Sequence, residues 1–147
     1  MEECVFCKIV KEELPCHKVW EDGEHLAFLS IFPNTDGVTV VIPKKHYGSY
    51  AFQLDEEVYT RLVLAARRVG LRMDRAFDDV GRTALVFEGF GVDHVHAKLF
   101  PMHGTGGQGA WRPILSGKSE FFTEYLGFIS THDAARAMMR ILRGSRA

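Results

Sequence analysis

The sequence predicts a single domain that combines β-strands with one long α-helix, on three observations. The chain has 147 residues, the size of one domain, and 46% of them are hydrophobic, which is sufficient for a sizeable core. Short runs rich in β-branched and aromatic residues, separated by turn residues, precede residue 43 and recur after residue 82. Between them, apolar side chains recur at helical spacing over residues 55–78.

Three strands are expected before the helix. Residues 17–20 and 25–31 are largely apolar stretches separated by the turn residues 21–23, Glu-Asp-Gly. Residues 38–42, Val-Thr-Val-Val-Ile, form a β-branched run that is the strongest strand signal of this half, and Pro43 ends it.

The helix and two further strands follow. Asp55 is an N-cap residue with two glutamates after it, in the first turn, where the helix dipole favours acidic groups. Residues 83–87 and 94–100 are expected to be paired strands, joined by the tight connection 88–91, Glu-Gly-Phe-Gly.

The C-terminal third has a weaker pattern. Residues 103–109 form a glycine-rich loop, and a final helix is expected over residues 134–142. We expect residues 1–103 to form the core of the domain and residues 104–147 to form a C-terminal extension packed on it. Trp111 in this extension is a candidate for stacking on a ligand.

Charge and hydropathy exclude several classes of protein. Eighteen Lys and Arg residues against 19 Asp and Glu leave a net charge of −1, without the basic excess that binds a nucleic-acid polymer. No apolar run approaches the roughly 18 residues of a membrane span, so no membrane partner is expected. The N-terminus lacks the apolar segment of a secretory signal, and the three cysteines are odd in number, so we expect a cytoplasmic protein.

Residues 94–100 carry the most distinctive chemistry. Successive side chains of a strand point to opposite faces. The face expected toward the core is Val95, Ala97 and Leu99, and the other face is His94, His96, Lys98 and Phe100. Three cationic or cationisable groups in line, roughly 6.5–7 Å apart, suit an anion such as a phosphate chain. Taken alone, the pattern also fits the solvated polar face of an edge strand.

Several sequence blocks surround this segment in a fixed order. They are Cys4-Val5-Phe6-Cys7-Lys8-Ile9, Leu14-Pro15, Val19-Trp20-Glu21-Asp22, Leu26-Ala27-Phe28-Leu29-Ser30-Ile31, Val40-Val41-Ile42-Pro43-Lys44-Lys45-His46 and His94-Val95-His96. In this order and at these spacings the chain resembles the histidine triad (HIT) family over roughly residues 4–103.

The resemblance implies an α+β fold, a half-barrel of antiparallel strands with one long helix packed on it, and a homodimer. It implies a purine nucleotide or dinucleotide ligand and cleavage at its α-phosphate, as in nucleoside phosphoramidases, dinucleoside polyphosphate hydrolases and nucleotidyltransferases. The central histidine of the triad, here His96, is then the nucleophile. Backbone amides at Gly89 and Gly91 would approach a phosphate closely.

The chain departs from the family pattern at several positions. The third triad position holds Lys98, which neutralises phosphate oxygens but is a poor general acid, so His103 is the nearest candidate for supplying the leaving-group proton. Ser30 stands where the family usually carries an acidic residue that contacts the ribose. The loop before the triad is shorter, and Asp93 places a carboxylate directly before His94.

The pair Cys4 and Cys7 allows a zinc site, a redox dithiol or a coincidence, and spacing alone does not select the further ligands. The family resemblance implies a structural zinc ion held by Cys4, Cys7, His46 and His94.

Three functions therefore stand beside one another. The first is a HIT-type hydrolase or transferase that acts through His96. The second is a zinc-stabilised nucleotide-binding protein with little or no turnover. The third, a hydrolase with a catalytic metal on His94, His96 and His103, lacks the carboxylate base in register that such sites usually have.

Overall fold

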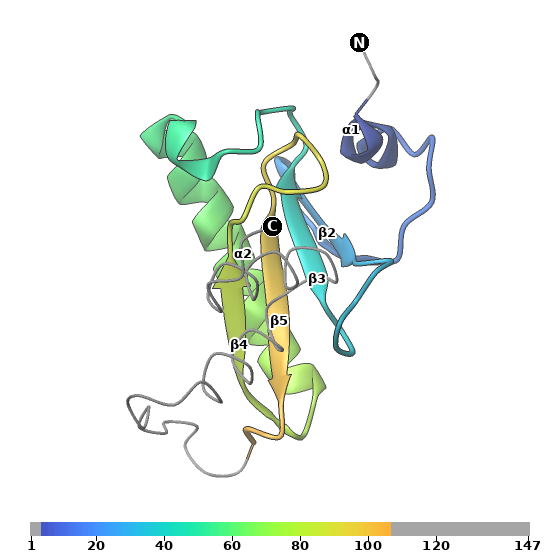
Figure 1. Cartoon of the computed structure of the whole chain (residues 1–147), viewed down its shortest axis with the longest axis vertical. Helices are drawn as coiled ribbons and strands as arrows, with labels where there is room; N and C mark the ends of the chain where they lie inside the picture. Colours follow the sequence, from blue (N-terminus) through green and yellow to red (C-terminus); the bar gives the residue numbers. More distant parts are fainter. Residues whose placement is uncertain (1–3, 107–147) are drawn as a thin grey trace, which may run out of the picture.

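The computed structural model describes residues 4–106. Its five strands form one antiparallel sheet in the order β1-β2-β3-β5-β4. The strands are β1 (Lys18–Glu21), β2 (His25–Leu29), β3 (Thr39–Pro43), β4 (Val80–Val86) and β5 (Ala97–His103). The helices are α1 (Val5–Val10), the 3-10 turn η1 (Ala51–Gln53) and α2 (Glu56–Ala76). The long helix α2 crosses behind the sheet (Figure 1), which confirms the α+β fold with one long helix.

The two faces of the sheet bury different side chains. One face packs on the apolar stripe of α2, which is Leu62, Ala65, Ala66, Val69 and Met73. The opposite face carries a second cluster made of Leu26, Phe28, Val40 and Ile42, against which Phe6, Ile9 and Val10 of α1 pack. The short N-terminal helix therefore covers part of the face that α2 leaves open.

The helix expected over residues 55–78 is confirmed as α2. Asp55 occupies the N-cap position, although its side chain makes no capping hydrogen bond, and the helix ends at Ala76 because Phe77 turns to extended backbone. The short helix α1 was not expected. Its six residues are too few for an apolar period to be recognised in the sequence.

Strand β5 begins three residues later than expected and ends three residues later. Pro43 has no N–H with which to extend the ladder between β3 and β5, and the N–H of Val95 instead donates to the carbonyl of Tyr47. At the other end, β5 continues through Pro101. Strand β3 pairs with β5 only as far as Leu99, so at Pro101 the ladder of β5 is with β4. The start of β2 at His25 is as expected, and the other strand boundaries differ from the expected ones by one to three residues.

The alternation expected around the triad is confirmed in part. Val95, Ala97 and Leu99 belong to the core beneath α2. His96 and Lys98 lie on the other face, but they are only 2% and 9% exposed, so this face is not solvated.

Across residues 4–106, no helix has the length and apolar character that crossing a membrane requires. The expected helix over residues 134–142, Trp111 and nearly all of the expected extension lie outside the described residues.

Candidate functional site

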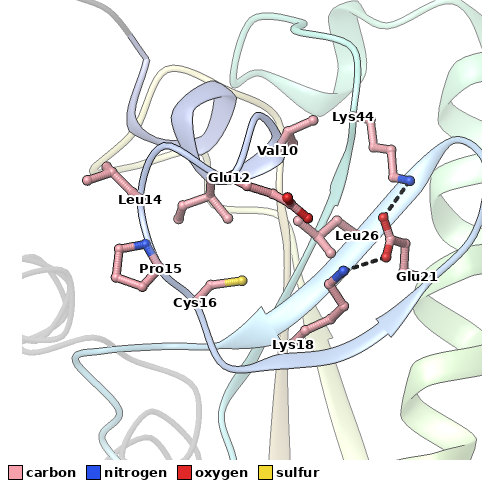
Figure 2. Close-up of a pocket in the computed structure, with 10 residues that line it drawn as sticks. Val10, Glu12, Leu14, Pro15, Cys16, Lys18, Glu21, Leu26 and Lys44 are labelled. Atoms are coloured by element: carbon pink, nitrogen blue, oxygen red, sulfur yellow. Dashed lines mark hydrogen bonds and ion pairs between the residues drawn. The ribbon is translucent and has the colours of Figure 1, made fainter.

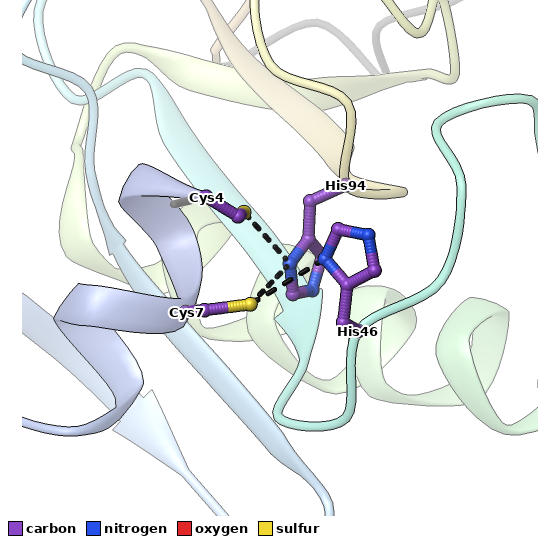
Figure 3. Close-up of side chains that lie close together, drawn as sticks. All are labelled: Cys4, Cys7, His46 and His94. Atoms are coloured by element: carbon purple, nitrogen blue, oxygen red, sulfur yellow. Dashed lines mark hydrogen bonds between the residues drawn. The ribbon is translucent and has the colours of Figure 1, made fainter. Parts of the chain in front are cut away.

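Two cysteines and two histidines meet beside α1 (Figure 3). Sγ of Cys4 lies 3.4 Å from Nδ1 of His94. Sγ of Cys7 lies 3.4 Å from Nδ1 of His46 and 3.6 Å from Nδ1 of His94, and all four ligand atoms lie within 4.8 Å of one another. A tetrahedral zinc ion with bonds of about 2.0–2.3 Å separates its ligand atoms by roughly 3.3–3.8 Å. The donor set and its spacing therefore fit a closed metal site.

A backbone carbonyl orients the His94 ring. Nε2 of His94 lies 2.9 Å from the carbonyl oxygen of Pro43, which only accepts hydrogen bonds, so Nε2 carries the ring proton. Burial lowers the pKa of His94 and keeps the ring neutral. Nδ1 therefore directs a lone pair toward the two sulfurs, as in a metal-ligating histidine whose second nitrogen is held by a carbonyl.

His96 is held in the opposite tautomer. Its Nδ1 donates to the carbonyl oxygen of His94 at 2.7 Å, so Nε2 is the unprotonated nitrogen of the neutral ring. Burial lowers the pKa of His96, which favours the neutral ring at neutral pH. A neutral imidazole with one free nitrogen is ready to act as a nucleophile without prior deprotonation.

Phe6 of α1 contacts both of these histidines. Its ring meets His94 and His96 edge-on, with centroid separations of 5.8 and 5.5 Å. Phe6 also packs edge-on against Phe28 of β2, at 5.5 Å. Phe6 is not among the site residues predicted from the sequence, because an apolar side chain in a short segment carries no chemical signal of its own.

Lys98 is paired with a carboxylate that the sequence analysis also did not identify. Nζ of Lys98 donates to Oε1 of Glu88, the second residue after β4. Lys98 lies opposite Val86 in the β4–β5 ladder. If this register continued for two more residues, Glu88 would lie opposite His96. Residues 88 and 96 are equally far from the midpoint between the paired residues Val86 and Lys98, and this symmetry is the sequence signal that would have indicated Glu88.

The connection between β4 and β5 passes close to the loop after β3. Gly89 and Gly91 both have positive φ, 73° and 89°. A Cβ on Gly89 would lie 2.9 Å from the carbonyl oxygen of Ser49, so this close approach requires glycine. Asp93 accepts a hydrogen bond from the backbone N–H of Ser49 at 2.9 Å, and the bonds from Ser49 lower the pKa of Asp93. This carboxylate therefore fixes the two loops to each other.

Ser30 and His103 are the remaining expected site residues. Ser30 follows β2 and its Oγ accepts a hydrogen bond from the N–H of Phe32 at 3.2 Å. His103 ends β5, six residues after Ala97, which is about 20 Å along an extended strand. Its Nδ1 lies 3.1 Å from the carboxylate of Asp79.

This placement does not support His103 as a proton donor beside His96, because the strand separates them. For the same reason it contradicts a catalytic metal held by three histidines, since His94 and His96 lie at one end of the segment and His103 at the other.

A pocket lies between α1 and β1, and none of the expected site residues lines it. Lys18 and Lys44 flank Glu21 at 2.6 and 2.7 Å (Figure 2). The hydrogen bonds from Lys18 and then Lys44 lower the pKa of Glu21 to about 2. Both lysines are thus engaged by a carboxylate, and the pocket does not present a free cation pair to a phosphate.

Comparison with known proteins supports one family. The model of the HIT domain matches residues 11–105. An uncharacterized HIT-like protein from Methanocaldococcus jannaschii is 35% identical over 106 residues, covering 68% of this chain and 79% of that protein. An adenosine 5'-monophosphoramidase from Schizosaccharomyces pombe is 38% identical over 101 residues, covering 67% of this chain and 73% of that protein.

A solved structure gives the same result. The crystal structure of a HIT family member from Bacillus subtilis superposes with a TM-score of 0.62 at 25% sequence identity, covering 99% of each chain. The segment that the HIT domain model matches, residues 11–105, includes His94, His96 and Lys98. The solved HIT family structure agrees with the sheet and helix described above. The chain belongs to the HIT family.

Proposed function

We propose that the protein is a HIT-type nucleotide hydrolase or nucleotidyltransferase that cleaves at the α-phosphate of a purine nucleotide through a covalent intermediate on His96. The observation that carries the proposal is the buried His96 ring, whose Nδ1 is held by the His94 carbonyl so that Nε2 is the candidate attacking nitrogen. The similarity to an adenosine 5'-monophosphoramidase supports a substrate of this class.

The site offers further groups for such a ligand. Lys98 lies on the same face as His96 and carries a positive charge. The backbone at Gly89 and Gly91 turns beside the His96 ring, with which the backbone of Phe90 interacts. Ser30, at the end of β2, takes the place expected to contact the ribose. We leave His103 out of this proposal because of its position at the far end of β5.

The test is release of nucleoside monophosphate from adenosine 5'-phosphoramidate and from dinucleoside polyphosphates. We expect wild type to release AMP from at least one of them and His96→Ala to lose the activity. The matched control is His17→Ala, which removes an exposed imidazole outside the site and is expected to leave the rate unchanged. Acid quench would hydrolyse the P–N bond of a nucleotidyl-histidine, so the covalent intermediate is sought by mass spectrometry after denaturation at alkaline pH.

The second candidate is a nucleotide-binding protein with little or no turnover. The pairing of Lys98 with Glu88 favours it, because a lysine in this position is a weaker proton donor than a histidine and its charge is already engaged. Nucleotide binding by wild type without AMP release from any substrate would select this candidate over the hydrolase.

We also propose that the cluster of Cys4, Cys7, His46 and His94 holds a structural zinc ion. Such an ion would fix α1 to the segment that carries His96 and would leave no open position for chemistry. Metal analysis of the purified protein is expected to give one zinc per chain, and less than about half an equivalent would count against the site.

We also propose that the protein forms a homodimer and is located in the cytoplasm. Strand β4 is one edge of the sheet within the described residues, and exposed leucines lie on it and on α2: Leu85, Leu64 and Leu71. An edge strand flanked by apolar side chains supports a symmetric contact with a second copy.

A further inference from the structure

Glu88 belongs to the wall around His96. Glu88 follows the end of β4 by two residues, and its carboxylate contacts Lys98, which comes two residues after His96 in the chain. The neighbouring Phe87 packs with Tyr59 in the core beneath α2. The Glu88 and Lys98 side chains are only 13% and 11% exposed, so the pair is largely shielded from water.

The pair cancels the charge that a phosphate chain needs. The ammonium of Lys98 donates to the carboxylate of Glu88, so the two side chains together carry no net charge. Charges shielded from water interact over longer distances than charges at an exposed surface. Accordingly, both act on His96: burial is the main cause of its lowered pKa, Lys98 lowers that pKa further and Glu88 raises it.

We propose that Glu88 determines the leaving-group specificity of this site: by neutralising Lys98 it favours substrates whose single phosphate carries an amine and disfavours substrates whose leaving group is itself a phosphate. The proposal rests on the function proposed above and names the residue that divides its two substrate classes.

The two substrate classes, phosphoramidates and dinucleoside polyphosphates, differ in the charge of the leaving group. With a phosphoramidate, the lone pair of His96 Nε2 forms a bond to phosphorus as the P–N bond breaks. The electron pair of that bond, with a proton from solvent, goes to the departing nitrogen and gives a neutral amine. Water then bonds to phosphorus as the P–Nε2 bond breaks; the electron pair returns to Nε2 and a water proton is released.

With a dinucleoside polyphosphate, the P–O bond breaks instead and its electron pair stays on a departing nucleoside phosphate. Each phosphate of that group adds a negative charge, and the charge grows on the bridging oxygen as the bond breaks. Glu88 opposes this charge and Lys98 is already engaged, so the transition state for an anionic leaving group lacks the compensation that a free lysine would give.

The experiment compares kcat/KM for adenosine 5'-phosphoramidate and diadenosine tetraphosphate in wild type, Glu88→Gln and Glu88→Asp. Glutamine keeps the shape and an oxygen acceptor for Lys98 but removes the charge. We expect wild type to prefer the phosphoramidate, Glu88→Gln to shift the ratio toward the polyphosphate by about tenfold or more, and Glu88→Asp to keep the wild-type preference. Glu57→Gln, which removes an exposed carboxylate paired with Arg61 on α2, is the matched control.

A binding measurement decides the role of Glu88 even without turnover. Calorimetric titration with AMP and with ATP, in the absence of divalent metal, is expected to show that Glu88→Gln strengthens ATP binding relative to AMP binding. Lys98→Gln, which removes the cation, is expected to weaken ATP binding relative to AMP binding. This variant replaces Glu88→Gln in the test if Glu88→Gln does not fold.

The outcomes separate the two proposals. Absence of turnover in wild type with a shifted ATP to AMP ratio in Glu88→Gln overturns the proposed hydrolase but supports Glu88 as the selecting residue. Equal ratios in wild type and Glu88→Gln, for kcat/KM or for binding, overturn the role of Glu88.

Discussion

His94 links the cluster of two cysteines and two histidines to the candidate nucleophile through separate atoms. Its Nδ1 faces the sulfurs of Cys4 and Cys7, its Nε2 donates to Pro43, and its carbonyl oxygen accepts the hydrogen bond from His96. A displacement of His94 therefore moves the group that fixes the tautomer of His96. The two neighbouring histidines carry different roles because their rings are held in opposite tautomers.

Gly89 provides a test of the close approach between the two loops beside His96. We expect Gly89→Ala to lower the free energy of unfolding by about 2–4 kcal/mol, because the left-handed backbone costs about 1–2 kcal/mol and the added Cβ meets the Ser49 carbonyl. Gly91 has a similar φ, but the space around an added Cβ is open, so Gly91→Ala is expected to lower the free energy of unfolding only by the cost of the left-handed backbone. Urea unfolding measures both, and equal losses would contradict the steric contribution.

His103 gives the stability of the protein a pH dependence. Its Nε2 lies 2.8 Å from the carbonyl oxygen of Asp36 and its Nδ1 lies 3.1 Å from Asp79. Both partners only accept, so both bonds form fully only with the imidazolium. The bond to the Asp36 carbonyl, followed by that to Asp79, raises the pKa of His103 above its ordinary value of 6.5.

Because the folded pKa is raised, this stabilisation is complete below the unfolded pKa and is lost as the pH rises through the folded pKa. We therefore expect the difference in Tm between wild type and His103→Gln to be larger at about pH 6 than at about pH 9. Asp79→Asn should reduce the same pH dependence. A Tm difference that grows toward alkaline pH would contradict the assignment.

At the scale of elements, α1 depends on its tertiary contacts. It has six residues, no acidic residue in its first turn and no side-chain cap, whereas an isolated helix needs about 12–15 residues. Its stability comes from Phe6, Ile9 and Val10 packed on the sheet and from Cys4 and Cys7 in the cluster.

We accordingly expect removal of bound metal by a chelator to accelerate hydrogen exchange in residues 5–10 more than in α2, because the helix then keeps only its apolar contacts. Cys7→Ser should reproduce the effect. Cys16→Ser is the matched control, since Cys16 lies outside the cluster. Unchanged exchange in α1 on loss of metal, measured by mass spectrometry, would contradict the anchoring role.

Local pattern was sufficient to predict most elements. The apolar stripe of α2, the β-branched run of β3 and the alternation at Val95, Ala97 and Leu99 each follow from burial on one face. The helix α1 and the register of β5 were not predictable in this way. The first is fixed by contacts distant in sequence, and the second depends on the missing N–H of Pro43 and on the bond between Val95 and Tyr47.

In the candidate site, too, features that depend on contacts between distant residues could not be predicted from local pattern. The tautomers of His94 and His96 depend on which carbonyl each ring meets, and composition does not encode that contact. The pairing of Lys98 with Glu88 depends on the path of the connection between β4 and β5, residues 87–96, whose geometry the sequence alone leaves open. The resemblance to the family supplied the four metal-cluster residues, and the structure brings them together.

At the scale of the whole molecule, the sheet has two unlike edges within the described residues. Strand β1 has four residues, whereas β4 has seven residues and an exposed leucine. Short edge strands resist further pairing, and a longer edge strand with apolar neighbours favours it. The β4 edge is therefore the side at which a second copy is expected.

We expect Leu85→Glu to shift the protein toward the monomer, since a buried charge at the contact would oppose association. Phe52→Glu is the matched control: Phe52 is more exposed than Leu85, at 79% against 42%, but lies in η1 away from β4. Sedimentation velocity measures the oligomeric state of both. A dimer that persists in Leu85→Glu would place the contact elsewhere.

The cluster of Cys4, Cys7, His46 and His94 also constrains the order of folding. Cys4 and His94 are 90 residues apart in sequence, so their contact closes a loop that contains β1, β2, β3, α2 and β4. Closing a long loop costs entropy that only the contacts inside it repay, so the four ligands assemble after the sheet has begun to form. During synthesis, the two cysteines and His46 leave the ribosome long before His94, so the cluster is complete only once the segment just before β5 has been made.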